Sequence, residues 1–267
     1  MCIGARAQTQ TGVPDDVGIQ LYSLRNQFKE DVPKTLELIN SWGITIIEGG
    51  DNTYGMPEAS FIELLENNNL KTASVGTNLE ELRDNPQETI RRAKTFGANY
   101  AMCAWIPHDR DNFTIEDVKN TIKIFNEAGK LLNDNGVHLV YHPHGYEFRP
   151  YQNGTLFDYM AQNAINFDFE MDVYWVVHGG EDPMALFEKY PTKFKLMHLK
   201  DMRKGTIGND SGQGDVEDNV VLGTGMINIK TLVAKGRELG VDYLFIEDES
   251  SRVVDQVPAS LTFLKSL

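Results

Sequence analysis

Eight short apolar runs alternate with longer amphipathic stretches along this chain, and this alternation restricts the fold more than any other feature. The runs are nearly continuous in apolar character, as is typical of parallel strands covered on both faces. They span residues 17–21, 43–48, 70–75, 99–104, 137–142, 167–172, 194–199 and 243–247. Helical patterns cover residues 32–42, 58–69, 86–96, 115–135 and 227–239. Strands that alternate with helices in this way predict an α/β fold with a parallel sheet.

Two parallel architectures compete for this pattern, a closed barrel and an open doubly wound sheet. The 267 residues are close to the roughly 250 residues of a single (β/α)8 barrel. A doubly wound sheet usually carries a glycine-rich phosphate turn after its first strand, and residues 20–25 contain none. The sequence therefore predicts a single (β/α)8 TIM barrel over residues 17–267, preceded by a disordered or processed leader over residues 1–16.

Charge and composition exclude several classes of partner. A net charge of −14 disfavours nucleic acid and anionic membranes, because both attract basic surfaces. No apolar run approaches the roughly 18 residues of a transmembrane helix. Cys2 and Cys103 form neither a disulfide framework nor a zinc cluster, and Cys103 is expected to be buried. These features predict a cytoplasmic protein, or a periplasmic one if an export signal has been removed.

Four of the predicted strands end in or near side chains that commonly bind metal ions. Asp172, His198 and Glu247 each close an apolar run, and a fifth-strand segment contains His142 and Glu147. The separations of 25 residues from Glu147 to Asp172 and 26 from Asp172 to His198 each match one strand–helix unit. Because the carboxyl ends of barrel strands meet at one mouth, these groups are expected to lie together. Such mainly oxygen ligands suit a divalent cation.

The most specific local motif is Tyr-His-Pro-His-Gly-Tyr-Glu-Phe at residues 141–148. Two histidines and a carboxylate lie just beyond a strand, so at least one of His142, His144 and Glu147 is expected to face the barrel mouth. Glu147 would add the negative charge that a cation favours, whereas His142 lies where the strand itself ends. The residues alone leave this choice open.

Further residues at the predicted strand ends are candidates for substrate contacts. Lys200 shares a strand face with His198, and its ammonium would stabilise a developing oxyanion or bind a hydroxyl group. The aromatic side chains could stack on a sugar ring, and the polar ones could hydrogen-bond to its hydroxyl groups. The candidate substrate-binding residues are Gln20, Glu48, Trp105, Trp175 and His178.

Together these motifs resemble segments of the xylose-isomerase-like superfamily of sugar isomerases and epimerases. The similar segments are residues 18–25, 48–50, 141–148, 170–178, 197–201 and 223–225. The resemblance implies a TIM barrel with one divalent cation. The mainly oxygen ligands suit Mn²⁺, which we expect in preference to Mg²⁺, Co²⁺ or Zn²⁺. The resemblance also implies that Glu147, Asp172, His198 and Glu247 hold this cation. Many members carry a histidine after the third strand, where this chain has Gly76.

The expected activity is that of a sugar isomerase or epimerase that removes a proton next to a sugar carbonyl and forms an enediolate. Glu147 and Glu247 would exchange the proton as base and acid, and His142 or His144 is the alternative base. Loss of a β-substituent after the same first step would instead make the enzyme a lyase or dehydratase on keto-sugars or 3-keto-glycosides. The substrate is expected to be a small carbohydrate, and the chain could form a homo-oligomer.

Two other function classes compete with this hypothesis. A non-catalytic sugar-binding barrel would retain the aromatic residues but no metal, and the acidic cluster disfavours it. A metal phosphodiesterase of the same superfamily would use three metals and many more histidines than the six present here. Phosphodiesters are also disfavoured by the negative charge of the chain.

Overall fold

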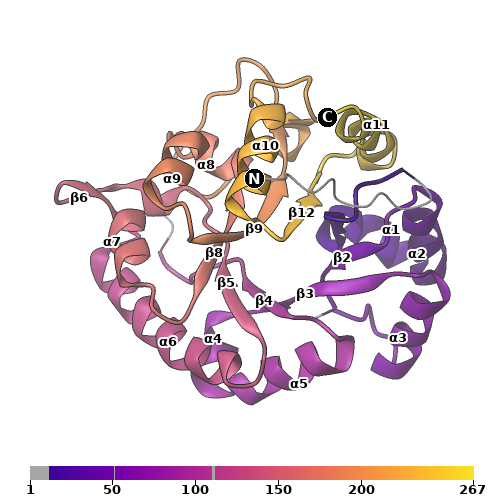
Figure 1. Ribbon diagram of the computed structural model, residues 1–267, viewed down its shortest axis with the longest axis horizontal. Coiled ribbons are helices and arrows are strands. Elements are labelled where there is room, and N and C mark those ends of the chain that lie inside the picture. The colour runs from indigo at the N-terminus through magenta and orange to yellow at the C-terminus, as the bar shows by residue number, and fades with distance from the viewer. Residues whose placement is uncertain (1–11, 51, 110–111) are drawn as a thin grey trace.

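Eight parallel strands close into a barrel in the computed structural model, which describes residues 12–50, 52–109 and 112–267 (Figure 1). Around the barrel the strands follow chain order, and β1 closes it by pairing with β12. The prediction of a single (β/α)8 barrel is therefore confirmed. The strands are β1 (Val17–Gln20), β2 (Ile46–Glu48), β3 (Lys71–Thr77), β4 (Tyr100–Cys103), β5 (His138–Tyr141), β8 (Asp168–Asp172), β9 (Phe194–Leu199) and β12 (Tyr243–Ile246).

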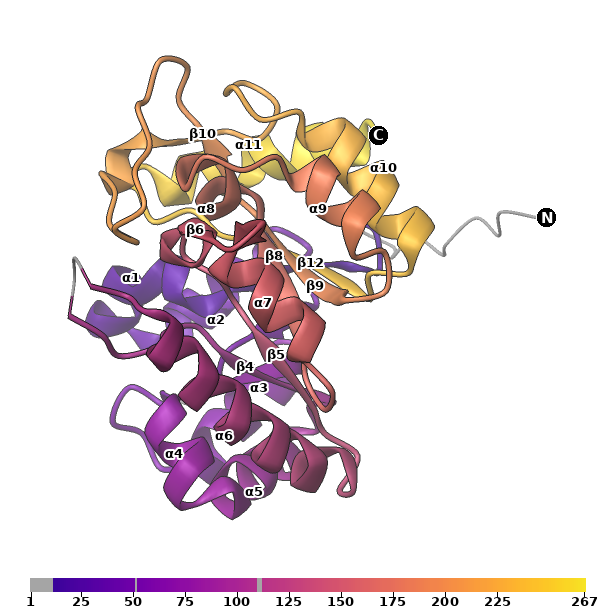
Figure 2. The same ribbon diagram turned by 90° about the vertical axis from the view of Figure 1, so that its left-hand side faces the viewer.

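Helices cover the outside of the barrel, and Figure 2 shows several of them from the side. Local signals in the sequence set their ends. The Thr114 hydroxyl and the Asp117 carboxylate cap each other's backbone N–H groups at the start of α6, and Gly240 ends α10 in the left-handed conformation. The helices are α1 (Arg25–Glu30), α2 (Val32–Ser41), α3 (Glu58–Asn67), α4 (Leu79–Asp84), α5 (Pro86–Phe96), α6 (Ile115–Asn133), α7 (Leu156–Asn163), α8 (Val173–His178), α9 (Pro183–Lys189), α10 (Ile229–Leu239) and α11 (Val253–Lys265).

Short strands and 3-10 helices lie in the loops at the strand ends. In the part of the chain that the structure describes, two antiparallel pairs of strands and three 3-10 helices interrupt the long connections. They are β6 (Pro150–Tyr151) with β7 (Gly154–Thr155), β10 (Asp201–Met202) with β11 (Asn219–Val220), and η1 (Leu21–Leu24), η2 (Tyr146–Phe148) and η3 (Val216–Asp218). The segment between β10 and α10 extends beyond the barrel (Figure 2).

The barrel interior is filled by a small apolar cluster that forms a floor for the site above it. Its buried members are Ala73, Met102, Val140, Leu196 and Phe245. Side chains two residues apart on a strand share a face, so the alternation that places these residues inside also directs the next inward residue toward the barrel mouth. On β5, β9 and β12 that next residue is His142, His198 and Glu247 respectively.

Close packing in the interior also explains why residue 18 is a glycine. A Cβ atom on Gly18 would lie 2.6 Å from the carbonyl oxygen of Ile46 and 2.9 Å from a ring carbon of Phe245. Even the smallest side chain at this position of β1 would therefore push the neighbouring strand away.

The described residues before β1 pack against the barrel. Val13 is buried, and the carboxylate of Asp16 pairs with the guanidinium of Arg237 at 2.8 Å. The rest of the predicted leader, residues 1–11, lies outside the described residues. Cys103 is buried as expected, and burial raises the pKa of its thiol to about 12. Within the described ranges, no helix has the length and apolar character needed to cross a bilayer.

Candidate metal centre

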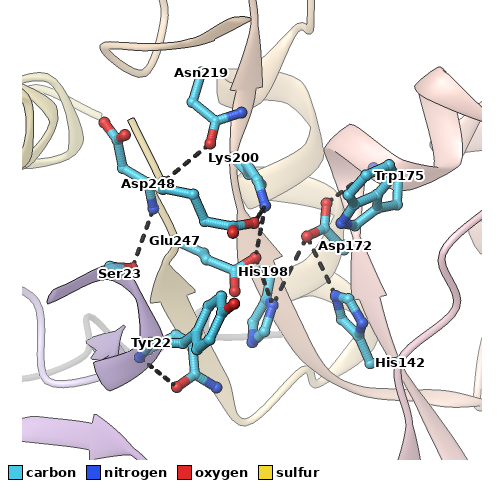
Figure 3. A network of polar contacts seen from close by, with 12 residues as sticks. Tyr22, Ser23, His142, Asp172, Trp175, His198, Lys200, Asn219, Glu247 and Asp248 are labelled. Carbon is cyan, nitrogen blue, oxygen red and sulfur yellow. Dashed lines mark hydrogen bonds and ion pairs between the residues drawn. The ribbon is translucent and has the colours of Figure 1, made fainter. Parts of the chain in front are cut away.

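Four buried side chains from four strand ends converge at the barrel mouth (Figure 3). His142 directly follows β5, Asp172 ends β8, His198 lies in β9, and Glu247 directly follows β12. One potential ligand atom from each of them lies within 4.8 Å of all the others. The strand ends therefore deliver two imidazoles and two carboxylates to one point.

The individual distances show how the cluster is arranged. The Nε2 atom of His142 lies 3.2 Å from Oδ2 of Asp172. The Nδ1 atom of His198 lies 3.8 Å from the same Asp172 oxygen and 3.5 Å from Oε2 of Glu247. The other oxygen of Asp172 accepts a hydrogen bond from the backbone N–H of Trp175 at 3.0 Å, at the start of α8. Asp172 thus caps a helix with one oxygen and faces the cluster with the other.

The electrostatics of the cluster favour a positive charge at its centre. Burial alone would raise the pKa of Asp172, but the imidazoles of His142 and His198 lower it to about 2. Burial would also raise the pKa of Glu247, but Lys200 and His198 hold it well below its usual range. Burial disfavours a charge on His198, but Glu170, Glu247 and other carboxylates raise its pKa well above the usual range. Both carboxylates of the cluster are thus ionised.

An unsatisfied imidazole nitrogen supports the same conclusion. The buried Nδ1 atom of His198 has no hydrogen-bond partner among the described residues, although it faces the ionised carboxylates of Asp172 and Glu247. Buried polar atoms are normally satisfied, so such an atom requires an explanation. A divalent cation fits here, since it would accept the imidazole lone pair and balance the two negative charges.

Glu147, expected as a ligand, does not reach this cluster. It is fully buried, and its carboxylate accepts hydrogen bonds from the Tyr141 hydroxyl and from the backbone N–H groups of His144 at 3.0 Å and Gly145 at 2.9 Å. Burial raises its pKa to about 7. The carboxylate closes the turn after β5, and His142 supplies the fourth group of the cluster. The described cluster thus contains His142 and not Glu147, while the predicted proton exchange between Glu147 and Glu247 stays a prediction.

A cavity of about 1110 Å³ opens onto the cluster. It is lined by three members of the cluster and by several of the predicted substrate-binding residues. His144 also lines it, with its ring centroid 5.4 Å from that of Trp105 and 5.3 Å from that of Trp175. Burial and the neighbouring His142 lower the pKa of His144 well below its usual range, so its imidazole is neutral. The lining includes Gln20, Trp105, His142, His144, Trp175, His198 and Glu247.

Lys200, expected to act on the substrate, is buried behind the cluster and is not part of the described cavity lining. Its Nζ atom lies 3.0 Å from Oε2 of Glu247 and 2.5 Å from Oε1 of Glu249. It also lies 5.4 Å from the ring centroids of Tyr174 and Trp175. Burial disfavours its charge, but the two glutamates raise its pKa and keep it an ammonium. The predicted catalytic role of Lys200 stays a prediction; in the structure its ammonium pairs with Glu247 and Glu249, which restrains Glu247.

We expect Lys200→Met to destabilise the metal-free protein by about 3–5 kcal/mol, because removal of one partner leaves buried charges unpaired. Urea unfolding of the metal-free variant and wild type would measure the difference. Lys130→Met removes an exposed ammonium paired with Asp134 at 2.8 Å and serves as the control, with an expected loss of about 0.5 kcal/mol or less. Equal losses in both variants would contradict the assigned role.

His178, predicted to contact substrate, instead holds a loop. It is buried and absent from the described cavity lining, and its Nδ1 atom lies 3.1 Å from the backbone oxygen of Asn209. Arg149 binds the same loop through Asp210 at 2.8 Å. Gly212 and two following residues of this loop line the cavity. The substrate contact predicted for His178 stays a prediction; in the structure His178 is connected to the site through this loop.

Gln20 and Glu48 lie at the ends of β1 and β2, as predicted, but only Gln20 belongs to the described cavity lining. Glu48 is fully buried beside His198. Glu170, which the sequence reasoning did not single out, is buried next to the same imidazole, with Oε1 3.2 Å from Nε2 of His198. The two-residue period of a strand could have indicated it, because Glu170 precedes Asp172 by two positions on β8.

Comparison with known proteins agrees with the fold. The model of the family described as xylose isomerase-like TIM barrel matches residues 36–267. The chain is 30% identical over 98 residues to inosose dehydratase 2 of Bacillus cereus, covering 36% of this chain and 32% of that protein. It is 33% identical over 91 residues to inosose dehydratase of Clostridium perfringens (strain 13 / Type A), covering 33% and 30%. The matches span about a third of the length of these relatives.

Several solved structures share the whole architecture. A sugar phosphate isomerase/epimerase from Parabacteroides distasonis ATCC 8503 superimposes with a TM-score of 0.79 at 22% identity, covering 100% of this chain and 98% of that chain. The probable 3-DHS dehydratase AsbF from Bacillus anthracis gives 0.70 at 14% identity, with 93% and 98% covered. The IolI protein with a zinc atom bound also gives 0.70 at 14% identity, with 94% of each chain covered. At these identities the likeness establishes the fold.

Proposed function

We propose that this chain, which belongs to the xylose isomerase-like TIM barrel family, is a divalent-metal-dependent dehydratase. Its substrate would be a keto-sugar or a related polyhydroxylated ketone, such as an inosose or a 3-keto-glycoside. One observation carries the proposal: His144 faces the cavity beside the metal cluster, while Glu147 is turned away from it. The site therefore has a neutral base next to the cluster and lacks the expected pair of exchanging carboxylates. The partial likeness to inosose dehydratases supports the same choice.

His142, Asp172, His198 and Glu247 would hold the cation. Two imidazole nitrogens and two carboxylate oxygens suit Zn²⁺, Mn²⁺ or Co²⁺ better than Mg²⁺, which prefers oxygen ligands. When bound, such an ion polarises a carbonyl group and stabilises the negative charge that develops on its oxygen.

His144 is the proposed general base. Its neutral imidazole can accept the proton from the carbon next to the carbonyl, which is acidified by the polarised C=O bond. The rings of Trp105 and Trp175 both contact the His144 ring and would provide apolar surfaces for the C–H face of a sugar. These three side chains line one cavity, so they can act on the same ligand.

A single base at this position is sufficient for elimination, because it can take one proton and return it to the leaving group. The C–H bond breaks as His144 takes the proton, and the electron pair forms a carbon–carbon double bond as the β-substituent leaves. This substituent is a hydroxyl group in an inosose or ketohexose and the aglycone oxygen in a 3-keto-glycoside. The protonated His144 returns its proton to the departing oxygen, so that water or the aglycone alcohol is released and the base is regenerated. The product is an unsaturated ketone, and no oxidant or reductant is required.

An isomerase or epimerase is the second candidate, and the position of Glu247 favours it. Its carboxyl group lines the same cavity as His144, so it could return the abstracted proton to a neighbouring carbon or to the opposite face. This outcome shares its first step with dehydration. Only the products distinguish the two.

The test is to strip the protein with a chelator, reload it with Zn²⁺, Mn²⁺, Co²⁺ or Mg²⁺, and incubate each form with inososes, ketohexoses and 3-keto-glucosides in D₂O. Elimination is expected to yield a conjugated ketone by ultraviolet absorbance, together with the loss of one water by mass, or of the aglycone alcohol from a 3-keto-glucoside. A deuterated product of the same composition would establish isomerisation or epimerisation. If no loaded form promotes elimination or deuterium exchange, both proposals fail.

A further inference from the structure

We propose that Glu48 is a positioning residue that fixes the imidazole of His198 with Nδ1 toward the metal cluster. The inference rests on the proposed function, because it concerns the same metal centre. Glu48 ends β2 on the opposite side of the barrel interior from β8, 150 residues before His198 in the chain. It lies outside the described cavity lining, so it acts through His198 and not on the substrate.

The two nitrogens of His198 face different partners. Nε2 lies 2.5 Å from Oε2 of Glu48, whereas Nδ1 faces Asp172 and Glu247 at 3.8 and 3.5 Å. A carboxylate can only accept a hydrogen bond, so Nε2 must carry the proton in this pair. When a metal ion takes the place of the second ring proton, the lone pair that binds it is therefore on Nδ1. Glu48 thus selects both the tautomer and the ring orientation.

Glu48 is itself held from the other side. The same Oε2 atom accepts a hydrogen bond from Nε2 of Gln20 at 2.9 Å. The side-chain oxygen of Gln20 accepts in turn from the backbone N–H of Tyr22 at 3.1 Å, at the start of η1. The side chains of Gln20, Glu48 and His198 are all buried. A chain of hydrogen bonds therefore connects the backbone after β1 to the metal ligand on β9.

Glu170 competes with Glu48 for this role, and geometry separates them. Its Oε1 atom is 3.2 Å from Nε2 of His198, yet neither of its oxygens has a hydrogen-bond partner among the described residues. The shorter contact and the hydrogen bond belong to Glu48. Glu170 lies beside the ring but does not form the hydrogen bond that orients it.

The experiment compares Glu48→Gln and Glu48→Leu with a matched control, Asp168→Asn. Asp168 also contacts a histidine, His138, at 2.9 Å, but it lies at the start of β8, away from the cluster. Zn²⁺ affinity would be measured by competition with a chelator. The ¹⁵N spectrum of His198 in the Zn²⁺-loaded protein would report which nitrogen binds the metal and which carries a proton.

In the wild type we expect Nδ1 to bind Zn²⁺ and Nε2 to carry a slowly exchanging proton. Glu48→Leu should lose about 10–100-fold in Zn²⁺ affinity, the usual effect of removing a carboxylate behind a ligating histidine. Glu48→Gln should recover most of the affinity, because its side-chain oxygen still accepts from Nε2–H. Asp168→Asn should change neither the affinity nor the His198 signals.

Several results would overturn the inference. Zn²⁺ bound through Nε2 in the wild type would do so even if Glu48→Leu fails to fold. Wild-type affinity in Glu48→Leu would show that Glu48 has no positioning role, and the same loss in Glu170→Gln as in Glu48→Leu would transfer that role to Glu170. A second equivalent of Zn²⁺ that Glu48→Leu removes would make the Glu48–Glu170 pair an ion site.

The same experiment separates this inference from the proposed function. Wild-type protein that binds Zn²⁺ as expected but converts no ketone would overturn the proposed function and leave this inference standing. Failure of the wild type to bind Zn²⁺ would overturn both.

Discussion

His142→Ala is expected to abolish stoichiometric metal binding, whereas Glu147→Gln is expected to keep the wild-type metal content. His142 supplies one of four converging groups, and its loss leaves three donors and an opening in the buried cluster. Glu147 contributes no ligand atom to this cluster. A glutamine in its place can still direct its carbonyl oxygen toward the backbone N–H groups of His144 and Gly145. Metal analysis after gel filtration in the presence of a weak chelator measures both variants.

This pair of variants separates two ligand sets that the motif at residues 141–148 allows. Metal lost from Glu147→Gln and retained by His142→Ala would restore the set that the family resemblance implied. Both variants should be checked for folding by urea unfolding, because Glu147 also joins the turn to β5 through the hydroxyl group of Tyr141. A moderate loss of stability in Glu147→Gln with full metal content is compatible with the structure.

His144→Gln is expected to lower kcat/KM by about 10²–10⁴-fold, the range for removal of a general acid–base group. Metal content should not change, because His144 is outside the four-residue cluster. Glutamine approximates the size and hydrogen-bonding groups of the imidazole, but it cannot accept a proton near neutral pH. The measurement is the initial rate with the best ketone from the substrate screen, together with the metal content of the same samples.

A second histidine in the same aromatic group provides the control. The ring centroid of His108 lies 5.1 Å from that of Trp105, but His108 is absent from the described cavity lining. His108→Gln should therefore leave kcat/KM within about threefold of the wild type. A rate of His144→Gln that matches that of His108→Gln would exclude His144 as the base and would favour Glu247.

Much of the barrel and part of the site could be predicted because both depend on the regular alternation of side chains along strands. Strands covered on both faces require apolar runs, and the eight runs coincide with the eight barrel strands. Asp172 and His198 lie within strands, where side chains alternate between the two faces. Their direction could therefore be derived from their spacing. Glu247, one residue beyond β12, continues the same alternation.

Three predicted site residues that the structure places outside the described cavity lining, Glu147, Lys200 and His178, lie beyond the regular strands. Glu147 is six residues past the end of β5, after a turn in which Gly145 has φ = +106°, so strand alternation does not determine its direction. Lys200 follows β9, and its ammonium turns toward Glu247 and Glu249 because a buried charge requires a partner. His178 ends α8 and meets a loop more than 30 residues later in the chain.

By itself, the sequence determined the parallel barrel and the mouth at which the side chains gather, and it predicted three of the four side chains of the cluster there. Alternation along an extended strand is a local property that the order of residues already contains. Only the tertiary structure decided that His142 takes the fourth position and that Glu48 orients His198. Those choices depend on turns and on buried polar groups from distant strands, where each side chain adopts the direction that satisfies its charge and hydrogen bonds.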